Sequence, residues 1–436
     1  MLQSVKNIFV VKDIRKKVLY TLLIIVLFRI GTFITVPGMN KLAFLEAVDT
    51  TTNGILGTIN IISGGAFNRF SIFAMTISPY ITASIVLNLL QTVIPSLEKL
   101  KNEGEVGRQK LAKYTKLLTI VFAIVEAVGL YFNYKSFLLA PMTYGVGKAV
   151  GLILFVLTLT AGTALLMWLS DKITEHGIGN GVSVIIFVGI VSGAPGAFVA
   201  LSEYAAGGVL NIITVIALII AFVVLLAGVV YVQQAERRIP VNYAKKVVGR
   251  KMYGGQNTHI PLKVAMAGVM PIIFAMSFMM IPATIIQLVT KGAATGFWGV
   301  VLKICSASTE SIWYLVAYAV IYMVLILLFT FVYTMFTVNP VEMSNQLKQN
   351  GGFIPGIRAG KNTAEYINKV LKNITWAGGL FLAIVAVLPV ALQGAMPGLA
   401  ISFGGTSILI VVSVALELLK TLESQMVSRH YDGFLD

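Results

Sequence analysis

Ten stretches of about 20 mostly apolar residues recur along this chain of 436 residues. Roughly 20 such residues in a helix cross the hydrocarbon core of a bilayer, and a helix pairs all of its own backbone groups there. The segments between the stretches leave no room for a large soluble domain. The sequence therefore predicts an all-α integral membrane protein with ten transmembrane helices. The predicted spans are 18–37, 71–93, 115–134, 148–169, 181–199, 209–232, 264–289, 312–336, 374–392 and 401–419.

The composition supports this class and excludes two others. Apolar residues make up 57% of the chain, and Asp, Glu, Lys and Arg only 12%, about half the share that is usual in soluble domains. A disordered chain would be poor in apolar residues. The net charge of +15 would suit a nucleic-acid partner, but Lys and Arg also collect in the cytoplasmic loops of membrane proteins.

The distribution of the basic residues predicts the orientation. Most of the 33 Lys and Arg residues lie in the N-terminal tail, in the loops near 94–114, 170–180, 233–263 and 337–373, or at the C-terminus. These segments share one side of the membrane if the number of spans is even. The positive-inside rule then predicts that both termini are cytoplasmic. The basic residues elsewhere are Lys41, Arg69, Lys116, Lys135, Lys148, Lys291, Lys303 and, inside the first span, Arg29.

Two of the inner loops, 233–263 and 337–373, are long and strongly basic. Orientation alone needs only a few charges, and a solvated loop is the plain interpretation of most of these residues. The length of the loops favours a second interpretation, in which they dock an anionic or RNA-containing partner.

The segment 54–70 is apolar but too short to span, and Gly64-Gly65 interrupts it. Because a span follows directly, we expect a re-entrant half-helix that glycines hinge to that span. An interfacial helix on the outer surface is the alternative. Proline also occurs inside predicted spans, where it can kink the helix, at Pro79, Pro271 and Pro282.

The predicted spans contain few charged or potentially catalytic side chains. Apart from Lys116 and Lys148 at the ends of spans, their charged residues are Arg29, Glu126 and Glu417, which form no proton relay or catalytic pair in the sequence. His176, His259 and His430 and the single Cys305 show no metal-binding spacing. No nucleotide-binding or hydrolase motif occurs. We therefore expect no cofactor, no metal and no enzyme activity.

Eight motifs, in order and spread over nearly the whole chain, resemble the SecY family, which forms the channel of the bacterial Sec protein translocase. They are FRIGTFITVPG (28–38), SGGAFNRFSIFAMTISPYITASI (63–85), NEGEVGRQKLAKYT (102–115), EHGIGNGVSVIIF (175–187), RRIPVNYAKK (237–246), THIPLKVAMAGVMPIIFA (258–275), PGIRAGKNT (355–363) and FGGTSILIVV (403–412).

The resemblance implies two inverted, pseudosymmetric five-helix halves around a central pore, 1–204 with a plug at about 54–66 and 205–436 with the two long cytoplasmic loops. It also implies roles for particular residues. The pore ring would comprise Ile77, Ile81, Val182, Ile186, Ile273 and Ile410, and the plug would include Ile59, Ile62, Ser63, Gly64 and Gly65. The lateral gate would include Thr82, Asn88, Ile281 and Gln287. The residues that dock the motor or the ribosome would be Arg238, Lys246, Arg250 and Arg358.

The implied function is a passive protein-conducting channel in the bacterial plasma membrane. It would pass unfolded, signal-peptide-bearing polypeptides across the membrane and release membrane-protein helices into the lipid. The implied partners are the small membrane subunits SecE and SecG, the motor ATPase SecA, and the ribosome, including its RNA.

Two other classes of protein compete with a channel. A secondary transporter would need polar groups that converge on a midplane site, whereas the implied pore positions are aliphatic. An intramembrane protease or lipid transferase would need a catalytic or zinc constellation in its spans, and the sequence offers none.

Overall fold

A computed structural model describes residues 11–41, 43–45, 60, 63–139, 146–206, 211–243, 246–248, 251–253, 257–290, 295–308, 310–395 and 405–432. The chain divides into two compact units. The first comprises Met1–Ile212, Met276–Ala319 and Leu388–Asp436, and the second comprises Ile213–Ala275 and Val320–Val387. The division into halves at residues 204 and 205 stays a prediction.

Helices dominate the described residues, and each of the ten predicted spans overlaps one of them. These ten helices are α2 (Lys12–Gly31), α5 (Ser78–Val93), α7 (Glu105–Tyr134), α8 (Val146–His176), α9 (Gly181–Ala206), α10 (Ile212–Gln234), α11 (Met270–Thr290), α13 (Ile312–Thr337), α15 (Lys361–Ala395) and α16 (Gly405–Asp432). Shorter helices are α6 (Pro95–Asn102), the 3-10 turn η1 (Lys135–Phe137), α12 (Gly296–Cys305) and α14 (Pro340–Gln349).

Five helical stretches among the described residues are long and apolar enough to cross a membrane. They are Glu105–Phe137, Gly147–His176, Ile213–Gln234, Ile312–Gln349 and Lys361–Leu392. This confirms a helical protein with several membrane-spanning segments. The count of ten spans and their inverted symmetry stay predictions.

The second predicted span differs from expectation at its start. The sequence predicts a helix from residue 71, but residues 72–77 form turns and α5 begins at Ser78. Pro79 lies in the first turn of α5, where its missing N–H costs no intrahelical bond. Pro271 likewise lies at the start of α11, so that Pro282 is the only one of the three predicted kink sites inside a helix.

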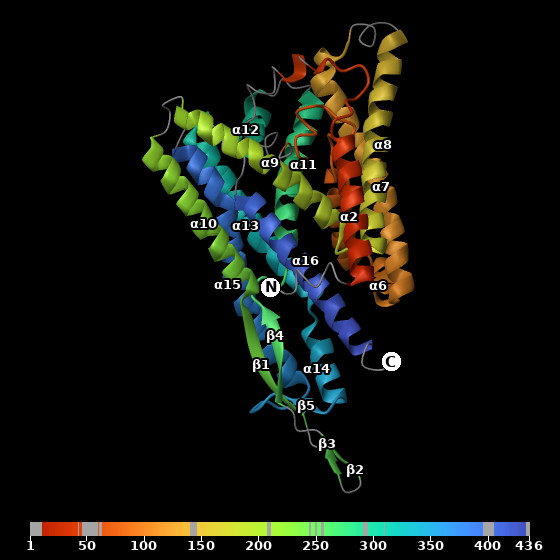
Figure 1. Ribbon diagram of the computed structural model, residues 1–436, viewed down its shortest axis with the longest axis vertical. Helices are drawn as coiled ribbons and strands as arrows, with labels where there is room; N and C mark the ends of the chain where they lie inside the picture. The colour runs from red at the N-terminus through yellow and green to blue at the C-terminus, as the bar shows by residue number, and fades with distance from the viewer. Residues whose placement is uncertain are drawn as a thin grey trace. The chain divides into compact units, whose positions relative to one another are not determined.

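In the first unit, α7 packs against both α5 and α8, and α8 also contacts α2 and α9 (Figure 1). The small buried residues Ala123, Ala127 and Gly129 lie on α7, where they allow close approach of its neighbours. Helix α16 packs against α9.

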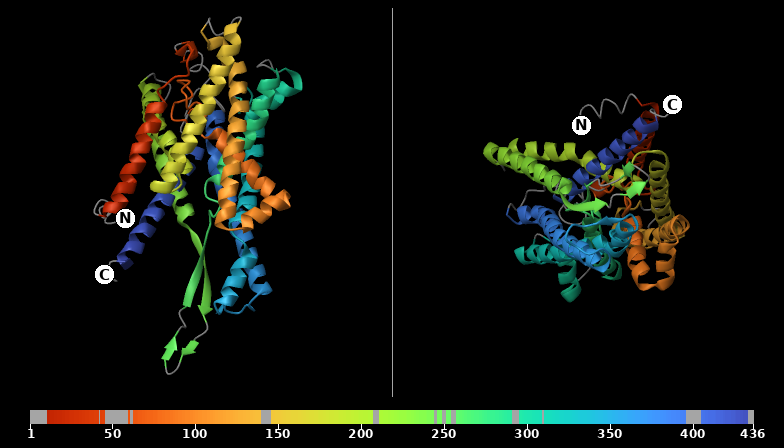
Figure 2. Two further views of the ribbon diagram at one scale, coloured as in Figure 1. Left: turned by 90° about the vertical axis from the view of Figure 1, so that its right-hand side faces the viewer. Right: turned by 90° about the horizontal axis from the view of Figure 1, so that it is seen from below.

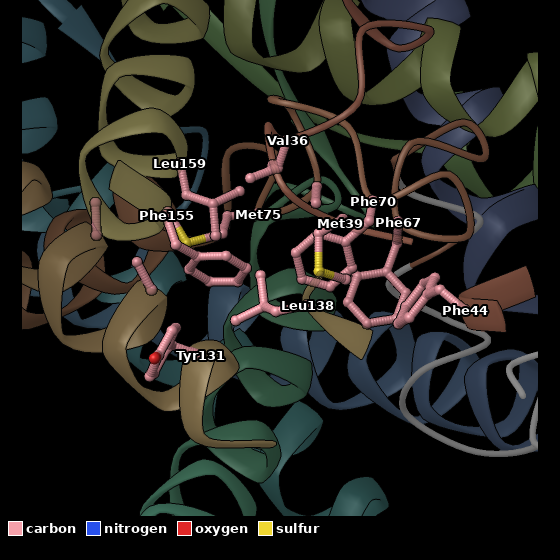
Figure 3. Close-up of a cluster of buried hydrophobic side chains, with 13 residues drawn as sticks. Val36, Met39, Phe44, Phe67, Phe70, Met75, Tyr131, Leu138, Phe155 and Leu159 are labelled. Carbon is pink, nitrogen blue, oxygen red and sulfur yellow. The ribbon is translucent and has the colours of Figure 1, made fainter. Parts of the chain in front are cut away.

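An aromatic cluster forms the core of the first unit beside the turns that precede α5 (Figure 3). The Phe44 ring lies edge-on to the Phe70 ring, with 4.9 Å between their centroids, and Phe70 lies 5.5 Å from Phe155 in α8. Phe67 belongs to the same cluster and is 1% exposed. The chain from Phe67 to Met75 is therefore anchored by packing although it is not helical.

The second unit contains a β-ribbon, which the sequence analysis did not predict. Strand β1 (Glu236–Tyr243) pairs antiparallel with β4 (Asn257–Lys263), and the hairpin of β2 (Lys246–Val248) and β3 (Lys251–Tyr253) lies beyond their ends (Figure 2). Short strand β5 (Gly352–Phe353) pairs with the far end of β1, giving the sheet order β4-β1-β5.

Alternating side chains of the ribbon bury one face against helices. Ile239, Val241 and Leu262 are buried with Leu347 of α14 and Ile367 of α15. Period-2 alternation of this kind is the ordinary signature of a half-buried strand. Pro240 is tolerated in the central strand because β5 pairs only with Asn242 and Tyr243.

Candidate pore, gate and docking residues

The predicted pore residues Ile77 and Ile81 lie at the start of α5. Ile77 immediately precedes the helix and is 3% exposed, and its carbonyl accepts a hydrogen bond from the Ile81 amide at 3.0 Å. Thr76, just before it, has φ of 52°. A β-branched residue rarely adopts a left-handed backbone conformation, and the surrounding structure must hold it there. The start of α5 is thus tightly specified.

Val182 and Ile186 lie one turn apart at the start of α9. Three hydrogen bonds from backbone N–H groups to side chains fix this start: Ile178 N to Thr21 Oγ1 (3.2 Å), Gly181 N to Thr174 Oγ1 (2.9 Å) and Val182 N to Asn180 Oδ1 (3.0 Å). Ile186 is buried, and Val182 is partly exposed.

The remaining two ring positions lie on other helices. Ile410 is 1% exposed in α16, which packs against α9 in the first unit. Ile273 is buried in α11 and belongs to the second unit. All six predicted ring positions are therefore described, on four helices. Their convergence on one constriction stays a prediction.

The predicted gate residues lie on two helices. Thr82 and Asn88 are on α5, and Thr82 Oγ1 donates to the Ser78 carbonyl at 3.2 Å. Ile281 is partly buried on α11, one residue before Pro282, and Gln287 is on the same helix.

Of the predicted plug, Ile59 and Ile62 lie outside the described residues, whereas Ser63, Gly64 and Gly65 lie within them. The two glycines have φ of 64° and 82°, a region that glycine enters without strain. Ser63 Oγ donates to the Asn60 carbonyl at 2.8 Å and accepts from the Phe67 amide at 3.1 Å. These bonds fold the end of the predicted plug into a compact turn.

Arg29 and Glu126, both in predicted spans, lie beside specific partners within the first unit. Arg29 Nη1 donates to the Gly64 carbonyl at 3.0 Å and to Ser192 Oγ at 2.9 Å. Glu126 is half-buried on α7 and lies close to Ser78, the first residue of α5. Glu417 is exposed on α16.

The two basic loops, predicted separately, are joined in the second unit. Strand β1 carries the exposed Arg238, whose Nε lies 2.7 Å from Glu236 Oε1. Strand β5, which pairs with β1, opens the loop that carries the exposed Arg358. Lys246 is the first residue of β2, and Arg250 lies outside the described residues.

The loop around Arg358 is held by hydroxyl groups. Thr363 Oγ1 donates to the Arg358 carbonyl at 3.0 Å, and Ser344 Oγ donates to the Gly360 carbonyl at 2.7 Å. Within the described residues the Arg358 side chain forms no ion pair, so its guanidinium is available for a partner. The described residues also contain no group of three or more His, Cys, Asp or Glu that could hold a metal.

Sequence reasoning missed the ribbon and the contact of Arg29. The alternation of Ile239, Val241 and Tyr243 was a usable signal for a strand. Nothing local pointed to the partners of Arg29, which are 35 and 163 residues away.

The fold has known counterparts among membrane channels. A structure described as that of a protein conducting channel covers 95% of this chain and 93% of its own, with TM-score 0.67 and 19% identity. Sec61 in the canine ribosome-channel complex from the endoplasmic reticulum matches with TM-score 0.64 and 18% identity, covering 95% and 93% of the two chains. The class is thus a multi-pass helical membrane protein with a channel fold.

Sequence comparison gives the family. The SecY family model matches residues 71–419. The protein translocase subunit SecY of Halalkalibacterium halodurans is 44% identical over 445 residues, and that of Bacillus subtilis is 41% identical over 448 residues; each alignment covers all of both chains. The chain belongs to the SecY family, as its motifs predicted.

Proposed function

We propose that this chain is the passive, protein-conducting pore of a bacterial Sec translocase. It passes unfolded secretory polypeptides across the plasma membrane and releases membrane-protein helices sideways into the lipid. The full-length similarity to translocase subunits supports this proposal. The observation that carries it is the aliphatic character of the six pore positions, of which four are buried.

The chemistry of the ring suits a seal that must let a polypeptide pass. An apolar constriction excludes ions by dewetting. Aliphatic side chains also offer a passing chain no hydrogen bonds that would hold it. In this proposal Ile77, Ile81, Val182, Ile186, Ile273 and Ile410 form the ring at the waist between two five-helix halves, 1–204 and 205–436.

The plug and the gate complete the pore. Residues 54–66 close the outer funnel at rest, hinged at Gly64-Gly65, whose positive φ values allow a sharp turn. The lateral gate opens between α5, with Thr82 and Asn88, and α11, with Ile281 and Gln287. Pro282 breaks the backbone hydrogen bonding of α11 and makes it easier to bend.

The β-ribbon and the loop at Arg358 form the docking surface for the partners that supply energy. Two of the similar structures are of ribosome-bound complexes, which supports a ribosome contact, and in this proposal that contact includes ribosomal RNA. Exposed Arg237, Arg238 and Arg358 supply the positive charge. SecA is the motor in this proposal, SecE and SecG are the small subunits, and the chain itself carries out no catalysis and binds no cofactor.

The test is crosslinking of a stalled secretory chain to single cysteines placed at Ile77, Ile81, Ile186, Ile273 and Ile410. We expect crosslinks from all five positions to one short segment of the stalled chain. A cysteine at lipid-exposed Leu157, 64% exposed on α8, is the control and should not react. Crosslinking at Leu157 as strong as at the ring would contradict the proposed pore.

A further inference from the structure

Arg29 lies in the apolar helix α2 among side chains that give it no counter-charge. Its neighbour Phe28 is 2% exposed, and among the described residues no carboxylate lies within ion-pair distance of the guanidinium. A charged group in such a place is costly unless polar groups satisfy it. A charge kept there points to a specific task.

The partners of Arg29 come from two distant segments of the first unit. Its Nη1 donates both to the carbonyl of Gly64 at 3.0 Å and to Ser192 Oγ of α9 at 2.9 Å. The Ser192 hydroxyl in turn donates to the Gly189 carbonyl at 2.7 Å, which aims its oxygen lone pairs at Arg29. One guanidinium nitrogen therefore ties Gly64 to α2 and α9.

A side chain at position 64 would crowd Arg29 and Ser192 and would sit at a positive φ of 64°. A Cβ atom there would lie 2.6 Å from Ser192 Oγ, 2.8 Å from Arg29 Nη1 and 3.1 Å from Gly189 Cα. At Gly65, which also has positive φ, a Cβ would meet nothing within 4 Å. Gly64 is thus closely packed whereas Gly65 is not, and the backbone of Gly64 fits against Arg29, Ser192 and Gly189.

The chain after this point is held by other means. Phe67 and Phe70 are buried in the aromatic cluster, and the Val36 amide donates to the Phe70 carbonyl at 2.9 Å. Loss of Arg29 would therefore free the Gly64 carbonyl from α2, while Ser63 and Asn60 keep their hydrogen bonds to the amides of Phe67 and Asn68 and residues 67–75 stay packed.

We propose that Arg29 is a positioning residue that latches the end of the plug: it binds the Gly64 carbonyl and, with Ser192, holds the plug in its resting place. This inference rests on the proposed channel function and on the assignment of 54–66 as the plug. A plug that moves away from α2 must break the charge-assisted hydrogen bond between Arg29 and the Gly64 carbonyl, which slows opening in the absence of a translocating chain.

The test is ion flux through the complete translocase, reconstituted in liposomes, at rest and with a stalled secretory chain inside. Arg29→Met should raise the resting flux by about tenfold or more, since a hydrogen bond to a charged group is lost. Ser192→Ala, which folds with the least disturbance, should raise it by a smaller factor. With the chain inserted, when the plug is displaced in every variant, the fluxes should match wild type.

Two matched glycine variants separate the latch from backbone strain. Gly64→Ala and Gly65→Ala both place alanine at positive φ, but only the first places a methyl group against Arg29 and Ser192. We expect Gly64→Ala to leak and Gly65→Ala to stay near wild type. Equal flux from the two variants would overturn the latch.

Deletion of residues 56–64 separates this inference from the function on which it rests. If the deletion leaks and Arg29→Met and Ser192→Ala stay tight, the latch is wrong and the plug stands. If the deletion itself is tight, the plug assignment fails and the latch fails with it. A flux increase in Arg29→Met that persists equally with a chain inserted would show general damage and would also overturn the proposal.

Discussion

Ile410 is the pore residue whose replacement tests the seal most directly, because it is 1% exposed and lies well inside α16. Ile410→Asn should increase ion leak and loosen the requirement for a good signal sequence, since an amide hydrates a constriction that an aliphatic side chain keeps dry. Conductance of the reconstituted channel and export of a precursor with a defective signal measure the two effects. Ile273→Asn should act in the same direction.

The conservative variant Ile410→Val provides the control. It removes one methylene-sized group, costs about 0.5–1.5 kcal/mol of stability, and leaves the ring apolar. We expect no increase in leak. If Ile410→Asn conducts and selects signals as wild type does, Ile410 is not part of the seal.

Arg358 tests docking at the level of one side chain. It is exposed, and its loop is fixed through backbone carbonyls, so charge reversal leaves the fold intact. Arg358→Glu should block motor-driven export while stability changes by about 0.5 kcal/mol or less. Export of a precursor into membrane vesicles with added motor, and thermal unfolding of the purified complex, are the two measurements.

Arg358→Lys keeps the charge and loses the planar guanidinium. Retained export in this variant would indicate that charge alone is recognised, and lost export that the bidentate geometry is needed. Normal export by Arg358→Glu would rule out the docking role.

At the scale of elements, the plug is the segment whose removal gives the clearest result. Deletion of residues 56–64 should leave an assembled channel that leaks ions at rest, because the described side chains of the aromatic cluster that anchors Phe67 and Phe70 lie outside this segment. Resting flux and the yield of intact complex measure the two parts of the prediction. A tight channel after the deletion would favour the alternative of an interfacial helix.

The aromatic cluster itself makes a prediction about stability. Phe67 is 1% exposed and its ring meets those of Phe44, Phe70 and Tyr134. Phe67→Ala should destabilise the first unit by about 3–5 kcal/mol. Phe297, 74% exposed on α12, is the matched control, and Phe297→Ala should change stability by about 0.5 kcal/mol or less. Similar unfolding temperatures for the two variants would contradict a structural role for the cluster.

The β-ribbon shows how an element joins two loops that the sequence keeps apart. Pairing of Tyr243 with Gly352 brings Arg238 and Arg358 into a single body with α14 and α15. A partner that contacts both basic loops therefore meets one folded surface and does not have to order two separate loops on binding.

For the whole molecule, the distribution of Lys and Arg predicts the orientation. In a Cys305→Ala background, a cysteine at Lys361 should react with a membrane-impermeant thiol reagent only from the cytoplasmic side, and a cysteine at Lys135 only from the outside. Both positions are exposed. Intact cells and inverted vesicles, labelled in parallel, provide the measurement. Labelling of both cysteines from the same side would contradict an odd number of spans between them.

The sequence by itself determined the helical membrane fold, the approximate place of its ten long apolar helices, and the family. Those properties depend on the local length of apolar runs and on motifs that are read without knowing what they contact. Even α5, whose predicted start was seven residues too early, differs only where Thr76 adopts a left-handed conformation just ahead of Pro79.

Only the tertiary structure decided which distant groups meet. Arg29 looked like an isolated charge in a span until Gly64 and Ser192 were found beside it, and the two basic loops looked independent until β5 paired with β1. The physical reason is the same in both cases. A hydrogen bond depends on positions within about 3 Å, and those positions are set by the packing of α2, α9 and the ribbon, which no local pattern of residues contains.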